Sequence, residues 1–185
     1  MARILRHYLA TMLTLIILMI ASAMVFAFWN AGRAAAERAE SLGRDACRIA
    51  GRYKDAIAYY EKVATVPTDD NAHNKRNHER ARASIEAIKL FESSNVKNVA
   101  DGTYRAESIG YEGPVHVEVA VSNQRIDAVR VVQHKEKQFY AAMTDTPAKI
   151  ISRQSVQGVD ATSSATITSE AILNATAKAL AKGAK

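Results

Sequence analysis

Ten residues near the C-terminus, Asp160-Ala-Thr-Ser-Ser-Ala-Thr-Ile-Thr-Ser169, have side chains whose types and spacing suit a bound phosphate. Six of the ten are Ser or Thr, so hydroxyl donors are dense. The sequence predicts a helix directly after them, from Glu170 to about Lys182. A phosphate held at this point would meet the positive end of the helix dipole and its unpaired backbone N–H groups. The same residues also suit a plain helix cap, because Ser and Thr commonly satisfy those N–H groups.

The residues before this loop predict a small antiparallel sheet. The segment Asp101-Gly-Thr-Tyr104 opens a strand, and Gly110 to Pro114 has the composition of a turn. Valines then alternate with other residues from Val115 to Val121, which is the period of a half-buried strand. A hairpin turn is predicted at Ser122 to Arg125, with Ile126 to Gln133 as the partner strand.

Helices are predicted to complete this C-terminal region. One runs from Pro147 to about Gln154, and the last is amphipathic and ends at Lys182 and Gly183. A run of strands followed by helices is typical of the α+β class. We therefore expect a domain over residues 98–185, built from a small antiparallel sheet with helices.

This ordered set of motifs resembles the FMN-binding domain family. The motifs are Asp-Gly-Thr-Tyr at Asp101, Gly-x-x-Gly-Pro-Val-x-Val-x-Val from Gly110, His-x-Glu from His134, and Asp-x-x-Ser-x-Ala-Thr-x-Thr-Ser-x-Ala-Ile from Asp160. The resemblance extends from about Asp101 to Gly183. The same domain occurs in the G subunit of the Rnf electron-transport complex and in the C subunit of the sodium-pumping NADH:quinone oxidoreductase. Those subunits are likewise anchored by one N-terminal helix.

The resemblance implies a covalent flavin. In that family the last Thr of the motif, here Thr166, carries FMN through a phosphoester bond. A separate flavin transferase would supply it from FAD with a divalent metal, releasing AMP. No catalytic residue and no metal site of this chain is predicted. The other residues expected around the cofactor are Asp160, Thr162, Ser163, Ser164, Ala165, Ile167, Thr168, His134 and Glu136.

Two departures from the family pattern bear on the site. The family often has Gly where this chain has Ser164, and a positive φ there would be less comfortable for Ser. Many members follow His-x-Glu with Thr-Pro-Gly and a glycine-rich loop, whereas this chain has the segment from Lys137 to Pro147. The surroundings of the isoalloxazine ring, and hence its redox potential, are therefore not carried over. Phe139, Tyr140 or Met143 could contact the ring or serve only in packing.

The N-terminus predicts a membrane anchor over residues 1–30. Tyr8 to Trp29 is free of charged residues and long enough to span a bilayer, and Arg3 and Arg6 precede it. The alternative is a cleaved signal peptide, because Ala21-Ser-Ala23 has the small-x-small form, but the apolar run continues past it. We expect a single-pass protein of the bacterial inner membrane, with the C-terminal domain in the periplasm.

Residues 31–97 predict a helical spacer. Ala, Arg, Glu and Lys dominate, and helices are expected up to Gly51, from Tyr53 to Thr65 and from about Asn71 to Ser93. Part of the segment, including Ala56 and Tyr60, is similar to one tetratricopeptide repeat. Such repeats are stable only when stacked, so a plain helical stalk stays open as the alternative. Both interpretations imply contact with a partner protein.

Composition and motifs disfavour several classes of function. The net charge of +6 comes from scattered residues with no long basic run, so nucleic-acid binding is not favoured. Cys47 is the only cysteine, which excludes an internal disulfide and a CxxCH haem site, and we expect it to be buried in packing. A hydrolase using Ser163 or Ser164 is disfavoured, because no Gly-x-Ser-x-Gly elbow is present.

With one flavin and no second redox group, the chain is expected to relay electrons between partner redox proteins. It would act as an electron-carrier subunit of an oxidoreductase system rather than as a stand-alone enzyme. The alternative function is a flavin-free, membrane-anchored adaptor that binds a partner protein through its helical segment.

Overall fold

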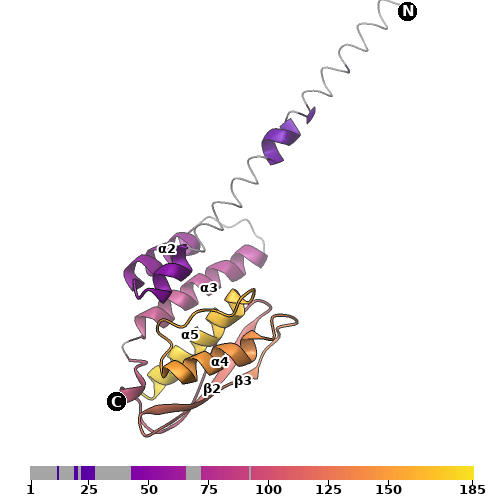
Figure 1. Ribbon diagram of the computed structural model, residues 1–185. Coiled ribbons are helices and arrows are strands. Elements are labelled where there is room, and N and C mark those ends of the chain that lie inside the picture. Colours follow the sequence, from indigo (N-terminus) through magenta and orange to yellow (C-terminus); the bar gives the residue numbers. More distant parts are fainter. Residues whose placement is uncertain (1–11, 13–18, 21, 28–42, 66–71, 92) are drawn as a thin grey trace, which may run out of the picture. The chain divides into compact units, whose positions relative to one another are not determined.

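The computed structural model describes residues 12, 19–20, 22–27, 43–65, 72–91 and 93–185 (Figure 1). The chain divides into two compact units, Met1–Leu42 and Gly43–Lys185. The second unit contains a three-stranded sheet and all the helices discussed below. The α+β class predicted from the sequence is confirmed.

The sheet has the order β1-β2-β3, from β1 (Gly102–Ile109), β2 (Pro114–Ser122) and β3 (Arg125–Gln133), and both pairings are antiparallel. Asn123 and Gln124 join β2 to β3 with φ values of 50° and 61°, which places both turn residues in the left-handed region. Such turns match the right-handed twist of paired strands. Along β2 the buried positions alternate as predicted, and they are Val115, Val117, Val119 and Val121.

Two long polar side chains occupy backbone groups of the two edge strands. The Gln154 side-chain amide accepts from the Ile126 N–H (2.7 Å) and donates to the Ile126 carbonyl (3.0 Å) on β3. The Lys182 ammonium donates to the Arg105 carbonyl (2.6 Å) on β1. Edge strands expose such groups, and unpaired groups favour pairing with another chain.

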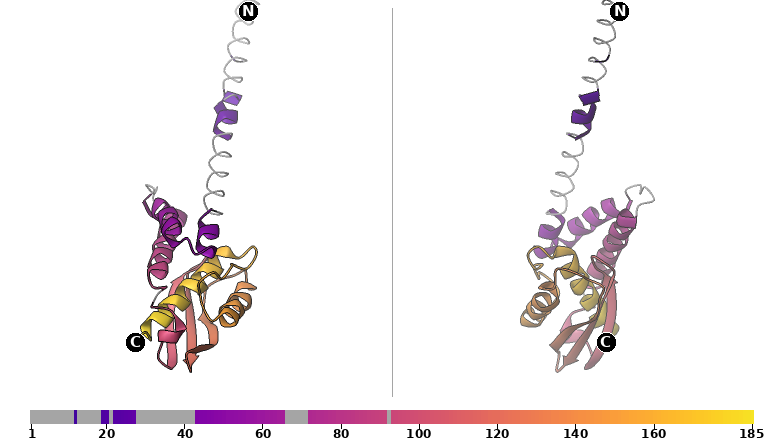
Figure 2. Two further views of the ribbon diagram at one scale, coloured as in Figure 1. Left: turned by 60° about the vertical axis from the view of Figure 1, so that its left-hand side comes forward. Right: turned by 90° about the vertical axis from the view of Figure 1, so that its right-hand side faces the viewer.

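Helices α4 (Ala142–Arg153) and α5 (Thr166–Lys182) pack on the sheet, α5 over β1 and β2 and α4 over β3 (Figure 2). Both start earlier than predicted. Pro147 lies inside α4, because burial of Ala142, Thr146, Pro147 and Ile150 on one face outweighs the backbone hydrogen bond that proline lacks. In α5 the Ser169 N–H donates to the Ala165 carbonyl (2.9 Å) and closes a turn in the segment predicted as a loop.

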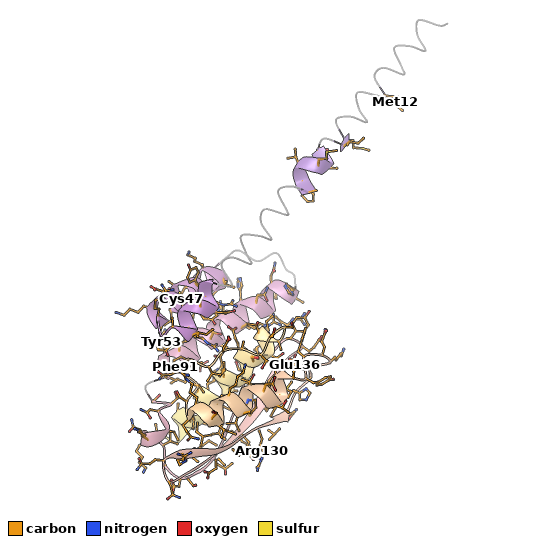
Figure 3. The ribbon with its side chains drawn as sticks, in the orientation of Figure 1. Met12, Cys47, Tyr53, Phe91, Arg130 and Glu136 are labelled. Carbon is orange, nitrogen blue, oxygen red and sulfur yellow. The ribbon has the colours of Figure 1, made fainter. Side chains whose placement is uncertain are left out.

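The upstream helices belong to the same compact unit as the sheet. Residues 43–49 are helical, α2 (Tyr53–Thr65) has the predicted bounds, and α3 (Ala72–Lys89) packs against both α2 and α5. A short 3-10 helix, Val96–Asn98, leads into β1. Tyr53 in α2 meets Phe91 edge to face with ring centroids 5.0 Å apart (Figure 3). The predicted division at residues 97 and 98 therefore separates helices and sheet that pack on each other.

Three buried side chains bear on the predicted helical segment. Ala56 and Tyr60, which belong to the segment similar to a tetratricopeptide repeat, are buried, and so is Cys47, as expected. The resemblance to a tetratricopeptide repeat stays a prediction.

Most of the predicted anchor, residues 1–30, lies outside the described residues. Among the residues that are described, no helix is long and apolar enough to cross a membrane. The described part therefore does not support the predicted transmembrane helix. Residues 22–27 are helical, and Met24, Val25 and Phe26 in this stretch are exposed.

Candidate functional site

The hydroxyl-rich loop ends at the start of α5, and Thr166 is the first residue of that helix. The Thr166 side chain is half-buried, whereas Ser163 and Ser164 before it are exposed. No side chain caps the helix, and its first turn begins with N–H groups that have no carbonyl partner within the helix. The start of α5 therefore combines a half-buried threonine with open backbone donors, an arrangement that suits an anionic group.

Ser164 adopts φ of 62°, the left-handed region that the missing glycine of the family pattern would favour. Next to it, the Ala165 N–H donates to the Thr162 carbonyl (3.0 Å). The departure noted in the sequence is therefore a real strain, of about 1 kcal/mol for a residue with a Cβ. The loop keeps its tight shape despite the substitution.

Three buried hydroxyls hold the loop against α4, and we call them the hydroxyl clamp: Thr146, Thr162 and Ser169. The Thr146 hydroxyl lies 3.2 Å from that of Thr162 and donates to that of Ser169 at 3.1 Å. The Thr162 N–H also donates to the Ser169 hydroxyl (3.0 Å). The hydroxyl of Thr162 is therefore engaged in shaping the loop.

A lysine on α4 braces the beginning of the same loop. The Lys149 ammonium donates to the carbonyls of Asp160 (3.2 Å) and Ala161 (3.3 Å). The Asp160 residue itself is exposed. A positive charge consequently lies at the loop that precedes Thr166.

A second group of residues predicted for the site meets the same helix. Glu136 is buried after β3, and its Oε2 accepts from the Thr168 hydroxyl (3.0 Å) in the first turn of α5 (Figure 3). Its Oε1 accepts from the Glu112 N–H (3.1 Å). His134 is exposed, and its ring lies 6.2 Å from that of Tyr140. The structure therefore joins Glu136 and Thr168, while His134 contacts a neighbouring exposed ring.

Aromatic side chains surround the segment after Glu136. Phe139, which has φ of 65°, packs edge to face against Tyr111 with centroids 5.4 Å apart. Tyr140 is more than half exposed (57%), and Met143 is half-buried. Phe139 is thus engaged in packing, whereas Tyr140 presents its ring to the outside.

A buried ionic cluster, which we call the charged clamp, holds the second turn of α5: Glu170 with Arg44, Arg48 and Tyr60. The Tyr60 hydroxyl donates to Glu170 Oε1 (3.0 Å), and Arg48 Nη1 and Arg44 Nη2 lie 3.7 and 3.9 Å from the same oxygen. Arg48 Nη1 is buried without a hydrogen-bond partner. The clamp joins residues 43–49 and α2 to the helix that begins at Thr166.

The charged clamp perturbs the groups within it. Burial by itself raises the pKa of Glu170, but the charges of Arg44 and Arg48, together with hydrogen bonds from Asp45 and Tyr60, outweigh it, so the pKa is lowered. Burial and the charge of Glu170 raise the pKa of Tyr60. Burial, and then Glu170, raise the pKa of the neighbouring Asp45 to about 6. Glu170 is therefore held as an anion, and Asp45 titrates close to neutral pH.

Sequence reasoning missed both clamps and a third contact. Ser169 was part of the quoted motif but not of the predicted site, and Arg44, Arg48 and Tyr60 belong to the predicted spacer. Arg80 in α3 also reaches the C-terminal region, at the turn before β2. Each is a contact between residues far apart in sequence, and no local pattern signals it.

The fold and the site together define a small α+β domain in which the N-terminus of α5 has backbone N–H groups that suit an anion. Residues 110–181 match the family model of the FMN-binding domain. This match confirms, for residues 110–181, the resemblance to that family seen in the sequence. FMN is the cofactor that this family points to.

The chain is also similar to an uncharacterized protein of Treponema pallidum (strain Nichols). The two are 36% identical over 110 residues, which is 58% of this chain and 29% of that protein. The chain thus spans less than a third of the relative's length.

Proposed function

We propose that this protein is a membrane-anchored electron-transfer flavoprotein that carries FMN covalently on Thr166 through a phosphoester bond. The observation that carries the proposal is the position of Thr166, a half-buried threonine that is the first residue of an uncapped helix in the segment matching the FMN-binding domain. A phosphate attached there would face the open N–H groups of the first turn.

The residues around Thr166 have different roles in this proposal. The exposed hydroxyls of Ser163 and Ser164 and the N–H groups of the first turn, including that of Ile167, are the donors for the phosphate. Thr162 and Thr168 already have buried partners, so they shape the loop. Ala165 is buried and leaves room beside Thr166, and Asp160 is better suited to shaping the loop than to touching an anion.

Attachment would proceed by phosphoryl transfer from FAD. The Thr166 oxygen forms a bond to the FMN phosphorus, the pyrophosphate bond of FAD breaks, and AMP leaves. The hydroxyl proton passes to a base of the flavin transferase, which also supplies the divalent metal. FMN, once bound, supplies the redox chemistry, and the protein holds it in place and tunes its potential.

The membrane anchor and the location are proposed on the N-terminal sequence. Residues 19, 20 and 24–26 are apolar, described as helical and 48–70% exposed, which suits an apolar surrounding. With Arg3 and Arg6 on the cytoplasmic side, the C-terminal domain would lie in the periplasm of a bacterium. Its partners would then be the flavin transferase and redox proteins of the inner membrane or periplasm.

The test is the intact mass of the full chain produced together with a flavin transferase, with in-gel flavin fluorescence. The wild type is expected to gain the mass of one FMN and Thr166→Val none. Thr144→Val is the matched control, because Thr144 is an exposed threonine in the first turn of α4. No gain in the wild type, with the transferase active on another substrate, would overturn the proposal and favour the flavin-free adaptor.

A further inference from the structure

Arg80 connects the upstream helices to the C-terminal domain. It lies in α3, outside the segment that matches the family model. Its Nε donates to the Gly110 carbonyl (2.9 Å) and its Nη2 to the Tyr111 carbonyl (2.7 Å). Its Nη1 donates to Asn77 Oδ1 (2.7 Å), one turn earlier in α3. A planar guanidinium with several donors fixes both carbonyls at once, which a single ammonium cannot do in the same way.

The turn that Arg80 holds is the one that binds Glu136. The Gly110 N–H donates to the Gly113 carbonyl (2.7 Å), and the Glu112 N–H donates to Glu136 Oε1 (3.1 Å). A Cβ at Gly110 would lie only 2.4 Å from Glu136 Oε1. The backbone of this turn therefore has to be glycine for the carboxylate to approach, and its position decides where Glu136 sits.

Glu136 also contacts α5, the helix that begins with Thr166. Its other oxygen accepts from the Thr168 hydroxyl (3.0 Å), in the turn that begins with Thr166. A second line of contact runs through rings, because Arg80 lies 5.8 Å from the centroid of Tyr111, which packs on Phe139. Each contact along this path involves a buried or half-buried residue.

We propose that Arg80 is a positioning residue for the flavin. It fixes the turn at Gly110–Gly113, this turn fixes Glu136, and Glu136 orients the first turn of α5. Arg80 thereby sets how Thr166 presents its hydroxyl for flavinylation and how FMN is held afterwards. This inference rests on the function proposed above. It also makes the upstream helices part of the flavin site, beyond the boundary of the matched family segment.

The test is a double-mutant cycle in the full chain, with Arg80→Met and Thr168→Val alone and together. Purified flavin transferase and FAD are added, and intact mass follows the loaded fraction over time. Visible circular dichroism of the loaded protein then reports the surroundings of the flavin. Arg82→Met is the matched control, because Arg82 is an exposed arginine of the same helix.

Each single variant is expected to load roughly tenfold more slowly, since small misplacements of a reacting group cost this much or more. The double variant is expected to be no slower than either single one, because both break the same path. Arg80→Lys should not restore the rate, and the flavin dichroism should change in every Arg80 variant. Arg82→Met should match the wild type.

Four outcomes would overturn the inference. If Arg80→Met loads FMN at the wild-type rate with wild-type dichroism, Arg80 has no positioning role. If the decreases in loading rate multiply in the double variant, Arg80 and Thr168 act independently. If Arg80→Met does not fold, the cycle is run with Arg80→Lys, and wild-type behaviour there would contradict the need for the guanidinium. If the wild type gains no FMN while a control substrate does, the proposed function fails, and this inference fails with it.

Discussion

The hydroxyl clamp and the charged clamp hold two neighbouring residues of α5, Ser169 and Glu170, by different chemistry. The hydroxyl clamp joins the helix to α4 with neutral hydrogen bonds, and the charged clamp joins it to the upstream helices with buried ions. A neutral hydrogen bond contributes about 1 kcal/mol and does not titrate. A buried ion pair contributes little net stability but is costly to break from one side. The same helix start is therefore fixed on one side independently of pH and on the other in a pH-dependent way.

The largest effect is expected from breaking the charged clamp. Glu170→Gln removes the carboxylate that Arg44 and Arg48 share; Arg44 keeps its ion pair with Asp45 (3.1 Å), whereas Arg48 loses the carboxylate 3.7 Å away, and we expect the free energy of unfolding to fall by about 3 kcal/mol. Urea unfolding at pH 7.5 measures this change. Glu61→Gln is the control, because Glu61 is exposed on α2. A variant as stable as the wild type would show that the clamp does not hold α5.

A smaller loss is expected from the hydroxyl clamp. Thr162→Val removes one hydroxyl from a buried hydrogen-bonded group and should lower the free energy of unfolding by about 1–2 kcal/mol. The loss should be equal at pH 5 and pH 8, because hydroxyls do not titrate there. Ser163→Ala, at the exposed neighbouring position, should have almost no effect. A loss that changed with pH would contradict the contrast between the two clamps.

The pH dependence of the charged clamp should appear at Asp45. Its pKa is raised to about 6, so its contribution to stability is present below its ordinary value and is lost as pH rises through 6. Asp45→Asn should therefore be more stable than the wild type at pH 7.5, by about 1 kcal/mol after allowance for solvent screening. At pH 4 the wild type and Asp45→Asn should have the same free energy of unfolding.

Chemical unfolding of the wild type and Asp45→Asn between pH 4 and pH 8 measures the free energy of unfolding of each protein as a function of pH. The lowered pKa of Glu170 acts in the opposite direction, since its contribution is lost as pH falls through that lowered value. Parallel curves for the two proteins would contradict the prediction.

The change in stability should be smallest at Ser164, in the loop itself. Ser164→Gly relieves the positive φ and should raise the free energy of unfolding by about 0.5 kcal/mol, part of the gain being offset by a more flexible unfolded chain. Ser163→Gly has no positive φ to relieve and should lower it instead. Thermal unfolding of both variants measures these changes. A lower free energy of unfolding in Ser164→Gly would show that the serine side chain contributes to the stability of the loop.

The sheet could be predicted from the sequence because its signals are local. Alternating valines from Val115 to Val121 and the turn before Ile126 define two strands and their register. Helix starts were harder, because Thr166 to Ser169 have the composition of a loop and become helical through buried contacts. Pro147 marked a false boundary for the same reason, since packing of one face extends α4 past it.

The candidate site could be predicted only in part. The motif at Asp160–Ser169 and the resemblance to a family drew attention to the start of α5, and the matched segment agrees. The supports behind it depend on tertiary structure. Arg80 in a helix rich in charge has the same local sequence context as a solvated arginine, and Glu170 gives no sign that Tyr60 will reach it. Such pairs are visible only once the helices are packed.

The amide of Gln154 occupies both backbone groups of Ile126 and so takes the place of an adjacent strand at that point. A peptide that binds as an added strand along the β3 edge (β-augmentation) would first have to displace this side chain. The same holds for a second copy of the domain that met it edge to edge, which is the usual first step of sheet-mediated aggregation. One glutamine directly after α4 thus blocks strand pairing at this point of the β3 edge.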